Sequence, residues 1–88
     1  MASFYPHLYE TALALLIKAR VDAGLTEHEL AGRFGQSAAF VSSHESGRRL
    51  LDPAEFIAIC RAIGVEPYAL LRDAEETAGA LRMDQTES

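Results

Sequence analysis

Four glycines divide this 88-residue chain into short segments. Gly24, Gly35, Gly47 and Gly64 each follow a stretch with the apolar spacing of a helix. Glycine is favoured directly after a helix, because it adopts the left-handed backbone that closes the last turn without a steric penalty. No stretch shows the strict alternation of apolar and polar residues that is typical of a half-buried strand. The glycines therefore predict an all-α fold built from short helices.

Helix-start signals lie between these glycines. Thr26 and Glu29 have the spacing of a capping box, in which each side chain accepts a hydrogen bond from the other residue's backbone N–H group. Ser37 is a plain N-cap, Asp52 is an acidic cap followed by proline, and Pro67 opens the final helix. The predicted helices span residues 7–23, 27–34, 38–46, 53–63 and 67–80.

Apolar residues on these segments predict a compact five-helix bundle. They recur at the three- and four-residue spacing that gives each helix one apolar face. Leu13, Ile17 and Val21 lie off that face in the first segment. We expect either the N-terminal Phe4 and Tyr5 or a second subunit to cover them. The predicted core is Leu16, Ala19, Ala23, Leu30, Ala31, Phe34, Val41, Phe56, Ile59, Cys60, Ile63, Val65, Leu70 and Leu71.

Composition excludes several classes of protein. A hydrophobic content of 49% is too high for a disordered chain, and the single cysteine, Cys60, cannot form an internal disulfide. The apolar run at Ala12–Ile17 is too short to cross a membrane and no signal peptide is visible, so we expect a cytoplasmic protein. The histidines are scattered, and Ser42 and Ser43 lack a plausible His–Asp pair. We therefore expect no metal, no other cofactor and no enzymatic activity.

The charge distribution separates the chain into two regions. The net charge of −5 argues against nucleic-acid binding at first sight, but residues 18–61 carry six basic and six acidic residues. Residues 62–88 carry two arginines against six acidic residues. The acidity is therefore mostly C-terminal, and we predict one domain over residues 1–82 with an N-terminal extension, followed by a disordered acidic tail at 83–88.

The second and third predicted helices form a helix-turn-helix arrangement. They are short and are joined by a tight turn that contains Gly35. In such motifs the second helix of the pair enters the major groove of DNA, and small residues at the joint let the helices cross closely. Ala31 and Gly35 are the small residues here, and Val41 is the apolar anchor of the third helix.

The stretch from Gly24 to Leu71 resembles the XRE family of helix-turn-helix regulators, the group of the lambdoid phage repressors and Cro. With the preceding helix, the resemblance covers about residues 8–72. It implies a lambda repressor-like DNA-binding domain of bacterial or phage origin. It further implies a nucleoid-associated repressor that binds a palindromic operator in double-stranded DNA as a homodimer. The matching residues are Gly24, Leu25, Thr26, Glu29, Leu30, Ala31, Gly35, Val41, Ser42, Glu45, Gly47, Arg49, Leu51, Asp52, Ala62, Ile63, Gly64 and Val65.

The resemblance also assigns residue roles. Arg20 and Glu45 correspond to a partly buried ion pair that links the first helix to the third. Helix N-termini offer backbone N–H groups to phosphates, arginines after the third helix contact the backbone, and small side chains contact base edges or thymine methyls. The predicted DNA contacts are Thr26, Gln36, Ser37, Ala38, Ala39, Phe40, Ser42, Ser43, Arg48 and Arg49.

Several contact positions depart from the family pattern. Glu27 replaces a glutamine that contacts phosphate, Ala38 and Ala39 replace a glutamine and a serine, and Ser43 replaces a basic residue. His44 stands where an apolar or aromatic residue is usual, so we interpret it as a packing residue. These departures leave a second hypothesis open. The chain would then be a protein-interaction module on the same scaffold, a partner or antagonist of another regulator, binding through its acidic surface with little or no DNA affinity.

Overall fold

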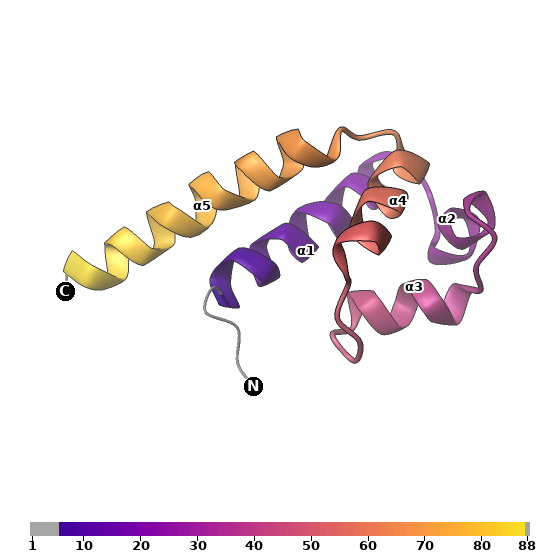
Figure 1. Cartoon of the computed structure of the whole chain (residues 1–88), viewed down its shortest axis with the longest axis horizontal. Coiled ribbons are helices and arrows are strands. Elements are labelled where there is room, and N and C mark those ends of the chain that lie inside the picture. The colour runs from indigo at the N-terminus through magenta and orange to yellow at the C-terminus, as the bar shows by residue number, and fades with distance from the viewer. Residues whose placement is uncertain (1–5, 88) are drawn as a thin grey trace.

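The computed structural model describes the backbone of residues 6–87 and the side chains of residues 7–79. Within this region the chain is all-α, without strands, as predicted (Figure 1). All five expected helices are present. Their bounds are α1 Pro6–Asp22, α2 Glu27–Arg33, α3 Ala38–Glu45, α4 Pro53–Ile63 and α5 Pro67–Glu87.

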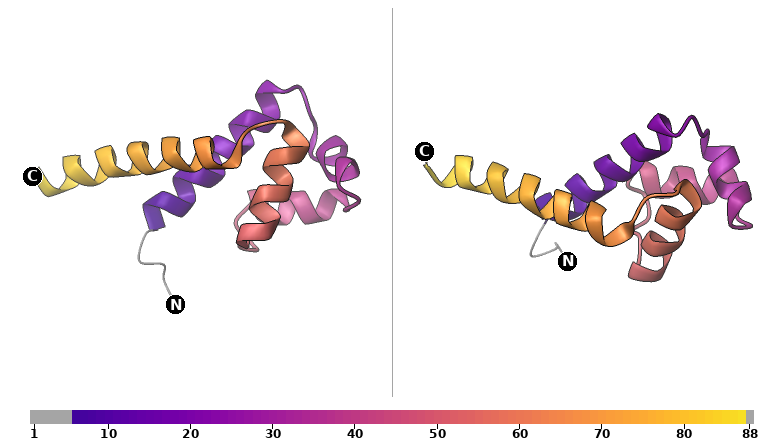
Figure 2. Two further views of the ribbon diagram at one scale, coloured as in Figure 1. Left: turned by 45° about the horizontal axis from the view of Figure 1, so that its top comes forward. Right: turned by 90° about the horizontal axis from the view of Figure 1, so that it is seen from above.

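The helices form two packed groups that share one core. α1 and α5 lie side by side although they are far apart in the sequence, and α2 packs closely on α3 (Figures 1 and 2). α4 contacts α1, α2 and α5, and so joins the two groups. The shared core consists of Ala12, Leu16, Leu30, Ala31, Val41, Phe56, Ile59, Cys60, Ile63, Leu70 and Ala74.

The predicted helix-end signals all operate. Gly24, Gly35, Gly47 and Gly64 have φ values of +75°, +75°, +85° and +97°, the left-handed region that favours glycine. Capping boxes are formed at the start of α2 by Thr26 with Glu29 and at the start of α4 by Asp52 with Glu55. Local sequence therefore sets the position of every turn that frames α2, α3 and α4.

Three expectations about the helices need correction. Ala23 is exposed rather than buried, because α1 ends at Asp22 and Ala23 lies in the following turn. Leu71 is 40% exposed, because it lies on the rim of a surface groove beside α1 and α4. α5 extends to Glu87 rather than ending near residue 80, since neither glycine nor proline follows Gly79 to end the helix.

Leu13, Ile17 and Val21 of α1, which we expected another segment to cover, differ in how far they are buried. Leu13 and Ile17 are half-buried, whereas Val21 is 57% exposed. Phe4 and Tyr5, which we considered as a cover, lie outside the described residues. None of the described helices combines the length and apolar character needed to cross a membrane.

Candidate nucleic-acid interface

α2 and α3 form the predicted helix-turn-helix. Ala31 and Val41 are buried at the joint between the helices, as expected from their size and spacing. The hydroxyl of Thr26 accepts a hydrogen bond from Glu29 N at 3.0 Å, and that of Ser37 accepts one from Phe40 N at 3.3 Å. Both helix N-termini are therefore capped, and Thr26 and Ser37 themselves are exposed.

The outer face of α3 is small and uncharged. Ala39 is exposed, Ala38 is half-buried, and Gln36 lies exposed just before the helix. The hydroxyls of Ser42 and Ser43 donate hydrogen bonds to backbone oxygens of α3 itself, at 3.3 Å to Ala39 and 2.9 Å to Phe40. The two serines must therefore exchange or share these bonds before they can bond to a base edge.

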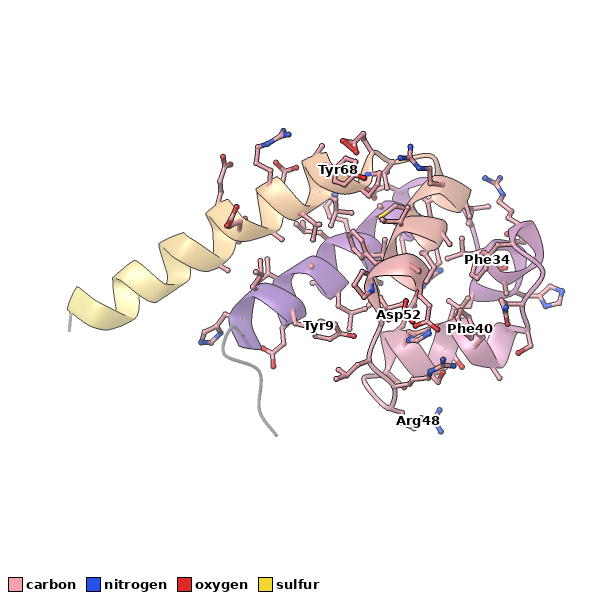
Figure 3. The ribbon with its side chains drawn as sticks, viewed as in Figure 1. Tyr9, Phe34, Phe40, Arg48, Asp52 and Tyr68 are labelled. Carbon is pink, nitrogen blue, oxygen red and sulfur yellow. The ribbon has the colours of Figure 1, made fainter. Side chains whose placement is uncertain are left out.

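The inner face of α3 carries an aromatic cluster. The ring of Phe40 packs edge-on against Phe34, with centroids 5.8 Å apart, and against His44, with centroids 4.6 Å apart. Figure 3 shows Phe34 and Phe40 together between α2 and α3. The ring of Phe40, one of the predicted DNA contacts, thus packs within the protein and leaves the outer face of α3 to smaller side chains.

His44 is buried at the base of this cluster, in agreement with its interpretation as a packing residue. Its Nδ1 lies 3.1 Å from the carbonyl oxygen of Arg49. A carbonyl only accepts, so Nδ1 carries the hydrogen. Nε2 has no hydrogen-bond partner among the described residues and lies 3.8 Å from a carboxylate oxygen of Glu55. His44 therefore fastens the loop after α3 to the core.

The structure brings Arg20 and Glu45, the pair expected from the family resemblance, into direct contact. Arg20 Nε and Nη2 donate to the two carboxylate oxygens of Glu45 at 2.7 and 2.9 Å, and Nη1 donates to the carbonyl of Leu25 at 2.8 Å. Each side chain of the pair is only 14% exposed. The hydrogen bond to Glu45 raises the pKa of Arg20 further above its ordinary value. Arg20 thus ties α1, the turn before α2 and the end of α3 together.

Glu27 lies beside this ion pair. The pKa of Glu27 is raised above the ordinary value for glutamate. The main cause is its contact with the Glu45 carboxyl, and partial burial is the second cause. Two neighbouring carboxylates repel each other, so sharing a proton between them becomes more favourable. Glu27 therefore places a carboxyl group, instead of glutamine, at the position where the family pattern has a phosphate contact.

The two arginines after α3 differ in their surroundings. Arg48 makes a single long contact, from Nε to the hydroxyl of Ser46 at 3.4 Å, and it projects from the loop (Figure 3). Arg49 donates from Nη2 to Glu55 Oε2 at 2.9 Å, and its guanidinium carbon lies 5.2 Å from the centre of the Phe40 ring.

Sequence reasoning missed Glu55 as a member of this site. The available signal was its place in the α4 capping box, six residues after Arg49.

A second feature that sequence reasoning missed lies on another side of the molecule. A groove of about 490 Å³ runs between α1, α4 and α5. The hydroxyl of Tyr9 at its edge accepts a hydrogen bond from Leu51 N at 3.1 Å and so connects α1 to the loop after α3. The groove is lined by Leu8, Tyr9, Ala12, Leu13, Leu51, Asp52, Pro53, Phe56, Ile57, Tyr68 and Leu71.

Comparison with known proteins identifies the same arrangement elsewhere. Residues 13–74 match a family described as "Helix-turn-helix domain". The fold is also similar to the solved structure of an XRE-family like protein from Pseudomonas syringae pv. tomato str. DC3000. That similarity has a TM-score of 0.77 and 47% sequence identity, and it covers 80% of this chain and 85% of the other. No curated protein matches the chain. The family match begins within α1 and ends within α5, so it includes the supporting helices as well as α2 and α3.

Proposed function

We propose that this chain, which belongs to the XRE family of helix-turn-helix DNA-binding regulators, is a repressor that binds a palindromic operator as a homodimer. The observation that carries the proposal is the pair of capped helix N-termini of α2 and α3, whose capping residues Thr26 and Ser37 are both exposed. Helix N-termini favour phosphate, because their free N–H groups and the helix dipole point toward it. A repressor of this kind acts on the nucleoid in the cytoplasm.

In the proposed complex, α3 lies in the major groove and its small residues read the bases. Ala38 and Ala39 pack against thymine methyls, where longer side chains do not fit. Ser42 and Ser43 turn from the α3 carbonyls toward base edges, and Gln36 supplies the one long amide among the predicted contacts. Arg48 and Arg49 contact phosphates beside the groove. Recognition then depends more on shape, methyl contacts and water than on bidentate pairs.

The proposed homodimer uses the groove between α1, α4 and α5. A two-fold interface is self-complementary, so one patch must present both a hollow and the groups that fill it. Tyr68 and Leu71 supply such groups at the rim, since they are 58% and 40% exposed. Among the described residues that line the groove, Asp52 alone is charged. A mainly apolar patch lets two copies of a chain with a net charge of −5 meet with few like charges facing each other.

One set of measurements tests the proposal. Fluorescence polarisation with duplex DNA from the region upstream of the gene, measured across a salt series, should give an affinity that falls steeply as salt rises. Analytical ultracentrifugation should give the mass of a dimer, and Leu71→Glu should shift it to that of a monomer. Val21→Glu is the matched control, because Val21 is also exposed but lies outside the groove lining. A monomeric wild type refutes the dimer, and absence of DNA binding at low salt refutes the repressor.

A protein-interaction module is the second candidate, favoured by one specific observation. Glu27 adds negative charge beside the N-terminus of α2, where an approaching phosphate is repelled. If no duplex binds at low salt, we infer that the chain is a protein-interaction module and that Glu27 contacts its protein partner. Loss of partner binding in Glu27→Ala, with the fold retained, then distinguishes the two functions.

A further inference from the structure

Arg49 is fastened at four points, which is unusual for a residue in an exposed loop. Its backbone N–H donates to the carbonyl of Ser43 at 3.1 Å, and its own carbonyl accepts from His44. Its side chain lies over the ring of Phe40 and donates to Glu55. The two backbone contacts fix the position of the Arg49 Cα atom. The contacts with Glu55 and Phe40 then set the position of its guanidinium group.

Glu55 is the fixed member of its pair with Arg49. Its Oε1 accepts a hydrogen bond from Asp52 N at 3.1 Å, and its backbone N–H donates to Asp52 Oδ1 at 2.7 Å. The side chain of Glu55 is 19% exposed, whereas that of Arg49 is 56% exposed. When the pair opens, Glu55 therefore stays at the start of α4 and the guanidinium of Arg49 moves.

Space for that movement lies beside the pair. A hollow of about 450 Å³ is bounded by Phe34, Gln36, Phe40, Arg49, Ala54 and Glu55. Only one of the five N–H donors of the Arg49 guanidinium is committed to Glu55. The guanidinium therefore has both room and free donors to turn toward a second anion.

We infer that Glu55 competes with DNA phosphate for Arg49 and thereby sets how strongly the protein holds the DNA backbone. Carboxylate and phosphate oxygens both accept from guanidinium N–H groups, and the guanidinium must turn away from Glu55 to reach a phosphate. Each contact that Arg49 makes with a phosphate therefore weakens its bond to Glu55. This inference rests on the proposed DNA-binding function, and it assigns Glu55 a role in affinity that is separate from its role as a cap.

The decisive variant is Glu55→Gln. Glutamine also serves at the third position of a capping box, so the start of α4 is retained while the charge is removed. Glu75→Gln on α5 is the matched control, because it removes the same charge from an exposed position outside this site. In polarisation assays at low salt, Glu55→Gln should bind every duplex about two- to fivefold more tightly, the range expected for release of a solvent-exposed pair. Glu75→Gln should leave the affinity nearly unchanged.

A double-mutant cycle separates competition from simple charge repulsion. Loss of repulsion between Glu55 and DNA tightens binding with or without Arg49, whereas loss of competition requires Arg49. The gain from Glu55→Gln should therefore be clearly smaller in the Arg49→Ala background. Equal gains in both backgrounds, or weaker binding by Glu55→Gln, overturn the inference while the proposed function stands. If only Glu55→Gln binds DNA, the competition is supported and the wild type is not a repressor. If neither protein binds, both proposals fail.

Discussion

α3 is held between two arginine–glutamate pairs that have the same chemistry and different surroundings. On one side, Arg20 and Glu45 form two short hydrogen bonds with each side chain only 14% exposed. On the other side, Arg49 and Glu55 form one hydrogen bond, and the arginine is 56% exposed. A buried charge left alone keeps its desolvation cost, whereas an exposed one is solvated again by water. The first pair therefore stabilises the fold, and the second is free to exchange partners.

The largest effect should follow from breaking the buried pair. Glu45→Ala leaves the Arg20 guanidinium without its carboxylate in a partly buried site, and we expect a loss of about 3 kcal/mol in the free energy of unfolding. The melting temperature should fall by roughly 12 °C or more, as measured by circular dichroism. A melting temperature within a degree or two of the wild type would show that the pair behaves as an exposed one.

The double variant Arg20→Met/Glu45→Leu is the control for this prediction. Replacing both charges by apolar side chains leaves no unpaired charge, so it should cost much less than Glu45→Ala.

The outward face of α3, between the two pairs, should control selectivity. Ala39→Gln adds a long amide to the exposed first turn, and it should change the preferred sequence or weaken the specific site by ~1–3 kcal/mol for each lost base contact. Binding to unrelated duplex should stay nearly the same, as should the melting temperature. Selection from a random duplex pool, with wild type in parallel, checks this. An identical selected sequence would place Ala39 away from the bases.

A smaller stability effect should follow from breaking the exposed pair. Arg49→Ala should lower the free energy of unfolding by less than about 1 kcal/mol. It should weaken binding to all duplexes by similar factors and reduce the slope of log affinity against log salt by about one. Urea unfolding and polarisation across a salt series measure the two quantities. A stability loss as large as that of Glu45→Ala would remove the contrast between the pairs.

The smallest effect concerns Glu27, next to the buried pair. Its pKa is raised in the folded protein, so the folded state binds this proton more tightly than the unfolded chain does. Its ionised form is therefore destabilising near neutral pH. As the pH falls through the raised pKa, Glu27 is protonated in the folded protein and the wild type becomes more stable relative to Glu27→Gln. This recovery is complete below the ordinary pKa of glutamate, where Glu27 is protonated in both the folded and the unfolded protein.

Glu27→Gln should therefore stabilise the protein near neutral pH by less than about 0.5 kcal/mol. The gain should disappear at about pH 4, near the ordinary pKa of glutamate. Urea unfolding of both proteins at the two pH values measures this difference. A gain that is independent of pH would mean that the charge of Glu27 is not its cause.

Much of the frame of this domain could be predicted because its signals are local. Asp52 begins α4 and Gly64 ends it through contacts within a few residues, so the neighbouring sequence is enough to predict where the helix starts and stops. Ala23 and Leu71 were assigned to the core wrongly, because helical spacing identifies an apolar face without showing whether another element covers it. The end of α5 was placed too early for a related reason, since charge and polarity alone do not stop a helix, and neither glycine nor proline follows Gly79.

The site was predicted less completely, because its main contacts join residues without a shared pattern. The pair of Arg20 and Glu45 was found only through the family resemblance, across 25 residues of sequence. The hydrogen bond from Leu51 N to the Tyr9 hydroxyl spans 42 residues, and the family resemblance did not point to it. Arg49 was predicted to contact DNA, but its hydrogen bond to Glu55 was not predicted, since Glu55 already had a sufficient explanation as a cap.

The side-by-side packing of α1 and α5 has a consequence for how the protein is made. Leu70 and Ala74 of α5 complete the core that contains Ala12 and Leu16 of α1. A ribosome-bound chain that has not reached α5 exposes this apolar face of its first helix and lacks part of the bundle. The helix-turn-helix is translated well before that point, yet it has no finished support. Folding of the whole domain therefore follows synthesis of α5.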